Sequence, residues 1–390
     1  MDTDTMGLVG FVLLLLIAAT VVVSLLRRRA SASGLDLALV ETFRVRVRAW
    51  WILFTGLAAA FLCDQYLARY LPGQTVTVIL FGLISFWALR EFITLTPTRP
   101  GDHRALFWVF FLCTPLQFVL VGMEGRWIFN EAHPHYLGFE SYDVYSIFIP
   151  VYAFLFIPAR VAMSGDAKRF LERTAKIQAG LLICVYCLSY APALLTLEIP
   201  VSNPAGEANR ESRGEETLPE PQGDAGRVAA PGGESGEASG RGSGTRAGGT
   251  VRLLFFFVLM TQLSDALQYS WSKLPSRHLI VPTISQTRTW EGLLGGAASV
   301  TLLGTALWFT TPFPQWWHAA LTSLVIALMG FAGGLTMSAI KRDRGVKDFG
   351  TLVEGHGGVL DRIDSICFAA PVFFHLAHFL ITGQVAPTGP

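Results

Sequence analysis

About ten runs of roughly 20 mostly apolar residues follow one another along the chain, and each is long enough to cross a bilayer as a helix. Only 15% of the residues are charged, whereas an ordinary soluble protein has about 25%. Most of the chain therefore avoids water, and we predict an all-α, polytopic integral membrane protein with about ten transmembrane helices. The predicted spans lie near residues 7–26, 49–69, 75–93, 105–123, 144–163, 177–197, 251–271, 293–311, 316–338 and 365–382.

Charged residues at the ends of these runs predict how the spans are oriented. Asp2 and Asp4 precede the first run and the arginines at 27–29 follow it, which is the reverse of a secretory signal and favours a retained span with its N-terminus outside. Counting onward places the basic clusters near 44–48, 90–104, 168–176, 273–288 and 341–362 on the cytoplasmic side. We see no organelle-targeting signal and predict a bacterial inner membrane protein. The net charge of +1 suggests no nucleic-acid partner.

Residues 201–250 differ from the rest of the chain. They are dense in Gly, Glu, Ser, Arg and Pro, and the stretch 204–250 has no aromatic residue. Such a segment cannot bury enough apolar surface to offset its ordering entropy, so we predict that it is disordered. It separates an N-terminal membrane block, residues 1–200 with about six spans, from a C-terminal block, residues 251–390 with about four.

The densest polar cluster follows the ninth apolar run and holds groups suited to a magnesium-bound nucleotide. Its lysines and arginines can donate to phosphate oxygens. Gly357 and Gly358, next to His356, permit close approach of the backbone to a ligand. Asp361 and Asp364 are spaced to share one face of a helix, and carboxylates are ligands that Mg²⁺ prefers. A basic cytoplasmic loop alone would explain the cations but not the glycines and the paired aspartates.

The order and spacing of this cluster resemble the signature of the phosphatidate cytidylyltransferase family. The positions in register are Ser338, Lys341, Arg342, Lys347, Asp348, Gly350, His356, Gly357, Gly358, Asp361, Arg362 and Asp364. Segments 262–269, with Asp265, and 285–296 resemble two further family segments, so the resemblance covers roughly residues 251–382. It departs from the family pattern at Val353, Glu354, Gln286 and Thr287. Gly334 stands where many bacterial members have Asp, so we assign no metal ligand there.

The resemblance implies an enzyme that joins CTP to phosphatidic acid, giving CDP-diacylglycerol and pyrophosphate for phospholipid biosynthesis. It implies Mg²⁺ as cofactor, held by Asp265, Asp361 and Asp364. The residues implied to act on the lipid phosphate and the triphosphate are Lys341, Arg342, Lys347, Asp348, His356 and Arg362. Those implied to bind nucleotide are Ser285, Thr289, Glu291 and Gly292. The expected partners are CTP, phosphatidic acid and the lipid bilayer at a cytoplasmic-side active site, with a homodimer as an open alternative.

Two other functions stay open at this point. A CTP-dependent lipid kinase would use the same nucleotide and cation but would release CDP rather than pyrophosphate. A non-catalytic lipid transporter or assembly protein would keep the polar loop only as a binding surface, which the departures from the family pattern leave open.

Overall fold

The structure is a computed structural model that describes residues 3–33, 37–67, 70, 74–95, 98–123, 141–197, 199, 238–274, 278–350 and 357–382. Over these ranges the regular elements are helices, and an isolated bridge pairs Leu279 with Thr289. The predicted all-α fold is confirmed. The predicted role of His356 falls outside the described residues.

Eight helical segments of the described chain are long and apolar enough to cross a membrane. They are Phe43–Leu67, Thr75–Thr94, Pro100–Gly122, Asp143–Ala162, Phe170–Thr196, Gly249–Trp271, Trp316–Asp343 and Leu360–Thr382. The two other predicted spans coincide largely with helices α1 (Thr3–Ser33) and α12 (Trp290–Ala306), the second of which has only 17 residues. The chain is therefore an integral membrane protein, as its apolar runs predict.

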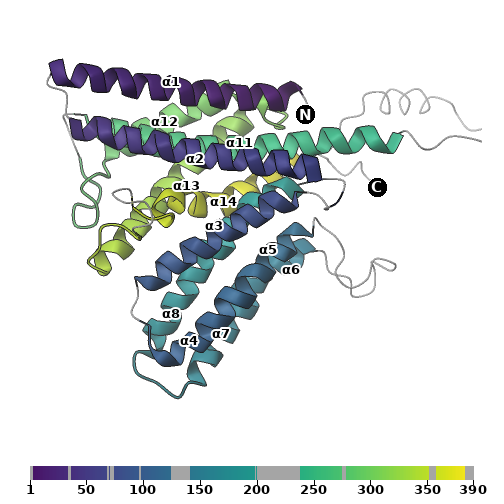
Figure 1. The fold of residues 1–390 in the computed structure, drawn as a ribbon, viewed down its shortest axis with the longest axis vertical. Coiled ribbons are helices and arrows are strands. Elements are labelled where there is room, and N and C mark those ends of the chain that lie inside the picture. The colour runs from purple at the N-terminus through teal and green to yellow at the C-terminus, as the bar shows by residue number, and fades with distance from the viewer. Residues whose placement is uncertain are drawn as a thin grey trace, which may run out of the picture.

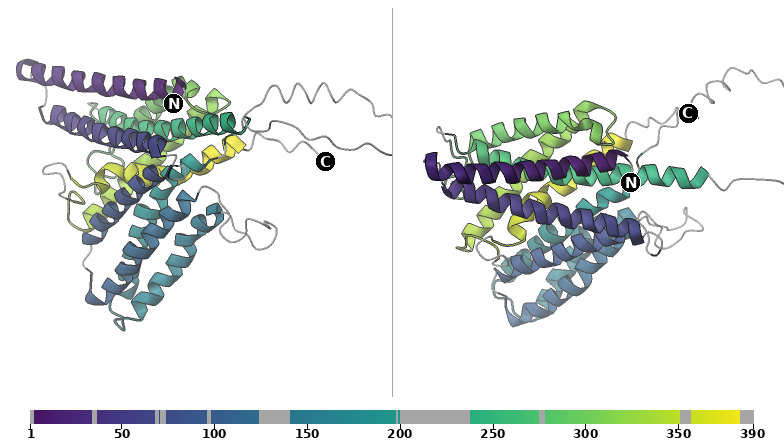
Figure 2. Two further views of the ribbon diagram at one scale, coloured as in Figure 1. Left: turned by 45° about the vertical axis from the view of Figure 1, so that its right-hand side comes forward. Right: turned by 45° about the horizontal axis from the view of Figure 1, so that its top comes forward.

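The helices form two groups that meet along α14 (Leu360–Thr382). In the first group α1 lies against α2 (Leu37–Leu67) and α11 (Ala238–Trp271), while α12 packs between α11 and α13 (Trp316–Asp343). In the second group α3 (Thr75–Thr94) packs against two later spans of the N-terminal block, at Pro100–Gly122 and Phe170–Thr196, and the helices of this group are tilted relative to α1 and α2 (Figures 1 and 2). Because α14 contacts α11 and α13 as well as α3 and α9 (Leu188–Ala193), it joins the two groups.

Three spans of the N-terminal block contain a short, wider π-helical turn in the middle. These spans are α4–η2–α5 (His103–Trp108, Val109–Cys113, Thr114–Gly122), α6–η3–α7 (Ser141–Ile147, Phe148–Ala153, Phe154–Ala162) and α8–η4–α9 (Phe170–Leu181, Leu182–Cys187, Leu188–Ala193). In the first, the Thr114 hydroxyl donates to the carbonyl of Val109, five residues earlier. The short helices η1 (Pro100–Asp102), η5 (Leu194–Thr196) and η6 (Trp308–Thr310) complete the described elements.

Helix α11 extends further toward the N-terminus than its apolar run. It begins at Ala238, so the end of the segment 201–250 that we predicted to lack structure is helical. Once a helix is nucleated, each further residue adds one backbone hydrogen bond. The helix that forms in the apolar run can therefore extend into the polar residues before it. Residues 200–237 lie outside the described residues.

The basic loops predicted to share one membrane side lie together at one end of the helices. Arg344, after α13, approaches Glu172 of α8 within 4.0 Å, and Arg99, before α4, lies 2.7 Å from Asp166. The bond from Arg99 lowers the pKa of the Asp166 carboxyl. Helix α1 begins and α14 ends at the opposite end (Figure 1). This arrangement agrees with the predicted alternation, while the assignment of the basic end to the cytoplasm stays a prediction.

The buried ion pair between Arg173 and Asp102 supports this end of the N-terminal block. The two side chains are 5% and 2% exposed, and Nη2 of Arg173 lies 2.7 Å from Oδ1 of Asp102. We expect Arg173→Ala to destabilise the protein by about 3–5 kcal/mol, because it leaves an uncompensated buried carboxylate. Thermal unfolding in detergent should show a clear loss, whereas Arg169→Ala, whose side chain is 76% exposed, should unfold like the unaltered protein. Equal melting temperatures for both variants would contradict this role.

Candidate functional site

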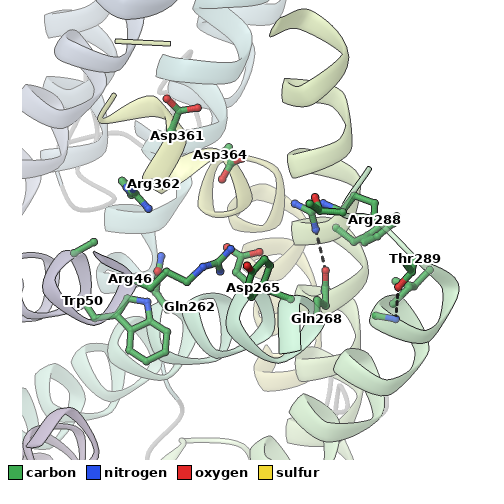
Figure 3. Close-up of a pocket in the computed structure, with 16 residues that line it drawn as sticks. Arg46, Trp50, Gln262, Asp265, Gln268, Arg288, Thr289, Asp361, Arg362 and Asp364 are labelled. Atoms are coloured by element: carbon green, nitrogen blue, oxygen red, sulfur yellow. Dashed lines mark hydrogen bonds between the residues drawn. The ribbon is translucent and has the colours of Figure 1, made fainter. Parts of the chain in front are cut away.

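A polar cavity of about 140 Å³ lies where α2, α11, α13 and α14 meet the loop that precedes α12 (Figure 3). Its lining residues come from both blocks of the chain and from all three segments that carry the family resemblance. They are Arg46, Ala49, Trp50, Gln262, Asp265, Gln268, Tyr269, Thr287, Arg288, Thr289, Gly292, Leu293, Phe331, Asp361, Arg362 and Asp364.

Two aspartates from different helices are tied together at this cavity. The Ser365 hydroxyl donates to Oδ1 of Asp265 on α11, at 2.9 Å. The backbone N–H of Ser365 donates to Oδ1 of Asp364 on α14, at 2.8 Å. Figure 3 shows both carboxylates directed toward the same space. Two carboxylates at one buried site repel each other when both are ionised, and cations placed there would compensate that charge.

Three arginines line the same cavity as these aspartates. Arg46 comes from α2, Arg288 from the loop before α12, and Arg362 from α14 (Figure 3). The Arg288 guanidinium donates to Oε1 of Gln268 at 3.0 Å and lies 5.2 Å from the centre of the Phe331 ring. Guanidinium groups stay charged and offer several donors, so this wall of the cavity suits phosphate oxygens.

Asp361 also lines the cavity, but its oxygens have partners in the last turn of α13 and in the loop that precedes α14. They accept from Nζ of Lys341 at 2.8 Å, from the Phe349 N–H at 2.8 Å and from the Gly358 N–H at 3.0 Å. No group of three or more His, Cys, Asp or Glu side chains in the described ranges is arranged to hold a metal ion. The predicted three-aspartate metal site stays a prediction, and Asp265 with Asp364 are its better-placed members.

The other predicted phosphate ligands lie around the cavity rather than in it. Lys341 pairs with Asp361 and lies over the Phe349 ring, 5.3 Å from its centre. Arg342 is exposed and donates from Nε to the carbonyl of Ile284 at 3.3 Å. Lys347 and Asp348 are exposed and do not line the cavity. Of the predicted cations, Arg362 is therefore the one whose side chain reaches the cavity wall.

Of the four residues predicted to bind nucleotide, two line the cavity and two do not. Thr289 and Gly292 line the cavity, and the Thr289 hydroxyl caps α12 by accepting from the Gly292 N–H at 3.0 Å. Ser285 is buried beside Thr287, with 3.2 Å between their hydroxyl oxygens. The His278 ring forms a 2.5 Å hydrogen bond with Glu291, which together with the bond from the His278 backbone N–H at 3.1 Å lowers the pKa of Glu291 to about 2. Ser285 and Glu291 thus shape the loop.

Sequence reasoning missed Arg46, Gln262 and Gln268 as residues of the cavity. Arg46 served only as an indicator of topology, since it belongs to a basic cluster at the start of a span. It packs against an aromatic ring instead, with its guanidinium carbon 4.8 Å from the centre of Tyr269. Gln268 donates to Ser264 and to the Ala327 carbonyl while accepting from Arg288. For Gln262 and Gln268 the signal in the sequence was a polar side chain inside an apolar run.

A second cavity, of about 520 Å³, adjoins the polar one and shares Ala49 and Arg362 with it. Its walls come mainly from apolar side chains of α2, α3 and α14. The lining residues are Val45, Arg48, Ala49, Ile52, Leu53, Gly56, Leu57, Leu80, Phe81, Ile84, Leu188, Val258, Gly357, Gly358, Val359, Arg362, Ile363 and Ile366. A charged cavity and an apolar cavity therefore meet at one arginine, as an amphiphilic ligand would require.

Comparisons with known proteins agree with this chemistry. A sequence model described as "Cytidylyltransferase family" matches residues 44–380. The chain is 31% identical over 337 residues to "Uncharacterized protein YnbB" of Escherichia coli (strain K12), covering 86% of this chain and 87% of that protein. It is 35% identical over 129 residues to a protein named phosphatidate cytidylyltransferase from Staphylococcus haemolyticus, covering 33% of this chain and 49% of that protein. The corresponding protein of Staphylococcus aureus (strain COL) is 36% identical over the same length.

Proposed function

Because the chain belongs to the cytidylyltransferase family and is a nucleotidyltransferase, we propose that it is a phosphatidate cytidylyltransferase. It converts CTP and phosphatidic acid into CDP-diacylglycerol and pyrophosphate at the cytoplasmic side of a bacterial inner membrane. The relatives that carry this activity in their names match about one third of the chain. We therefore infer the lipid substrate from the site of this chain.

The observation that carries the proposal is the junction of the two cavities at Arg362. The polar cavity offers three guanidinium groups to phosphate oxygens, and the adjoining apolar cavity is large enough to take part of an acyl chain. A lipid whose phosphate lies at Arg362 would have its tails beside α2 and α3. A water-soluble phosphate acceptor has no acyl chain to place against the apolar walls of the second cavity.

The reaction needs positioning and charge neutralisation more than proton transfer. A phosphate oxygen of the lipid forms a bond to the α-phosphorus of CTP, and the bond from that phosphorus to the β-phosphate oxygen breaks. Pyrophosphate leaves with the electron pair. The attacking phosphate is already anionic, so no general base is required. Arg46, Arg288 and Arg362 would hold phosphate oxygens of the two substrates around the α-phosphorus.

Asp265 and Asp364 suit a magnesium ion that also binds the substrate. Protein sites for Mg²⁺ commonly supply one or two carboxylates, and substrate phosphates and water complete the coordination. Such an ion would neutralise charge on the triphosphate. A site completed by substrate agrees with two close carboxylates and with no three-residue cluster in the described ranges. Asp361, paired with Lys341, would keep the preceding loop in place.

The proposal is tested by incubating the purified protein with CTP, dioleoyl phosphatidic acid and Mg²⁺ in mixed micelles. We expect CDP-diacylglycerol and pyrophosphate in equal amounts, with no product when EDTA removes the cation. Release of CDP together with a pyrophosphorylated lipid would identify a lipid kinase instead. Binding of CTP without any product would favour the non-catalytic alternative.

A further inference from the structure

The N-terminus of α14 is fixed by a carboxylate from the other helix group. Glu91, near the end of α3, accepts from the Val359 N–H at 3.0 Å through Oε1 and from the Leu360 N–H at 2.8 Å through Oε2. The first N–H groups of a helix have no partner within the helix, and a negative charge there also interacts favourably with the helix dipole. One side chain therefore caps α14 with both of its oxygens across 268 intervening residues of chain.

The surroundings of Glu91 are built to keep it in this place. Its side chain is buried, with 5% of the residue exposed, and the Trp87 indole N–H donates to Oε1 at 3.2 Å. A Cβ atom on Gly350 would lie 2.8 Å from Oε1, and one on Gly358 would lie 2.4 Å from Oε2. Both glycines are needed so that the loop can approach this carboxylate closely. The residue after Glu91 adds a further contact, because the Phe92 ring stacks on Phe349.

The cap lies next to the residues of the polar cavity. Asp361, Arg362 and Asp364 all lie within the first turns of α14, directly after the two N–H groups that Glu91 accepts. A shift or rotation of the start of α14 would move Arg362 and Asp364 relative to Asp265 on α11. A misplacement of about 1 Å at a reacting centre can cost roughly 10²-fold in rate.

We propose that Glu91 is a positioning residue for nucleotidyl transfer, which holds the start of α14 so that Arg362 and Asp364 meet the substrates in the polar cavity. This inference rests on the proposed function and gives the N-terminal block a part in it. Glu91 itself does not line the polar cavity and acts through the backbone of α14.

The first test compares Glu91→Gln and Glu91→Asp with the control Glu41→Gln, an exposed glutamate of α2 that pairs with Arg44. We expect Glu91→Gln to lower kcat roughly 10- to 100-fold while the KM for CTP changes by less than about threefold, since the cavity walls remain. Glu91→Asp keeps the charge and should recover part of the loss. An unchanged kcat in Glu91→Gln would overturn the proposal.

A double-mutant cycle separates positioning from general damage to the fold. The three atoms nearest to a Cβ on Gly350 all belong to Glu91, so Gly350→Ala should displace the carboxylate. In protein that already carries Glu91→Ala, the same change should cost little further activity, because its target is gone. Independent losses that multiply would overturn the proposal.

Hydrogen–deuterium exchange gives a readout that needs no turnover. In Glu91→Ala the amides of residues 358–364 should exchange faster than in the unaltered protein, and in Glu41→Gln they should not. Unchanged exchange would overturn the positioning role. If Glu91→Ala exchanged faster but the unaltered protein made no CDP-diacylglycerol, the proposed reaction would be refuted. The role of Glu91 in holding the start of α14 would then still stand.

Discussion

Asp364→Asn is expected to lower CDP-diacylglycerol formation by on the order of 10²-fold or more, because one of the two carboxylates that meet at the cavity loses its charge. Asparagine keeps the size of the side chain and one oxygen acceptor. The N–H of Ser365 can still donate to that oxygen. Folding should therefore be retained, and the loss should appear in turnover measured at saturating CTP and lipid.

A magnesium titration connects this loss to the cation. Ser365→Ala removes the hydroxyl that donates to Asp265 but leaves both carboxylates in place. Loss of a group that orients a metal ligand typically costs 10- to 100-fold in metal affinity or activity. We expect the activity of Ser365→Ala to rise again at high Mg²⁺, whereas that of Asp364→Asn should stay low at every concentration.

The matched control is Asp343→Asn at the end of α13, where the side chain is 67% exposed and pairs with Arg344 at 2.9 Å. It removes the same charge from the same end of the helix group without reaching the cavity. Its activity should equal that of the unaltered protein. If Asp364→Asn behaved like this control, the assignment of Asp364 to the cation would be wrong.

The fold could be predicted from the sequence because apolar runs of about 20 residues can satisfy their backbone in lipid only as helices. The candidate site could be predicted in part. Asp265, Asp361, Arg362 and Asp364 line one cavity although 95 residues lie between the first two. What the spacing could not decide is which way each side chain points. Lys341 and Asp361, predicted to bind different partners, bind each other.

The contribution of the N-terminal block could not be predicted for a different physical reason. Arginine at the start of a span is expected from the positive-inside rule alone, so Arg46 carried no separate signal. Glu91 sits at the end of an apolar run, where an acid can remain in contact with water. Its partners are backbone N–H groups about 270 residues away, and any residue type could supply them. Their roles appear only in the structure, where Arg46 lies over Tyr269 of α11 and Glu91 caps α14.

Gly334→Ala is expected to have the second-largest effect, because Gly334 provides the space that the Arg288 guanidinium occupies. A Cβ atom on residue 334 would lie 1.9 Å from Nη2 and 2.9 Å from Cζ of Arg288. The guanidinium must then move, which breaks its 3.0 Å bond to Gln268 and removes it from the cavity wall. We expect activity to fall roughly 10- to 100-fold, as a misplaced phosphate-binding group should cause.

Two further variants show whether the lower activity of Gly334→Ala results from displacement of Arg288. Gly330→Ala, one turn earlier on α13, adds the same methyl group where the nearest atom is 3.4 Å away, in the Ser365 side chain, and should keep most of the activity. Arg288→Ala should lose activity to a similar extent as Gly334→Ala. Since both changes remove one guanidinium from one place, the double variant should be no worse than Arg288→Ala alone. A double variant whose losses multiply would mean that the methyl group at 334 disturbs the site in another way, and that Arg288 does not depend on the glycine.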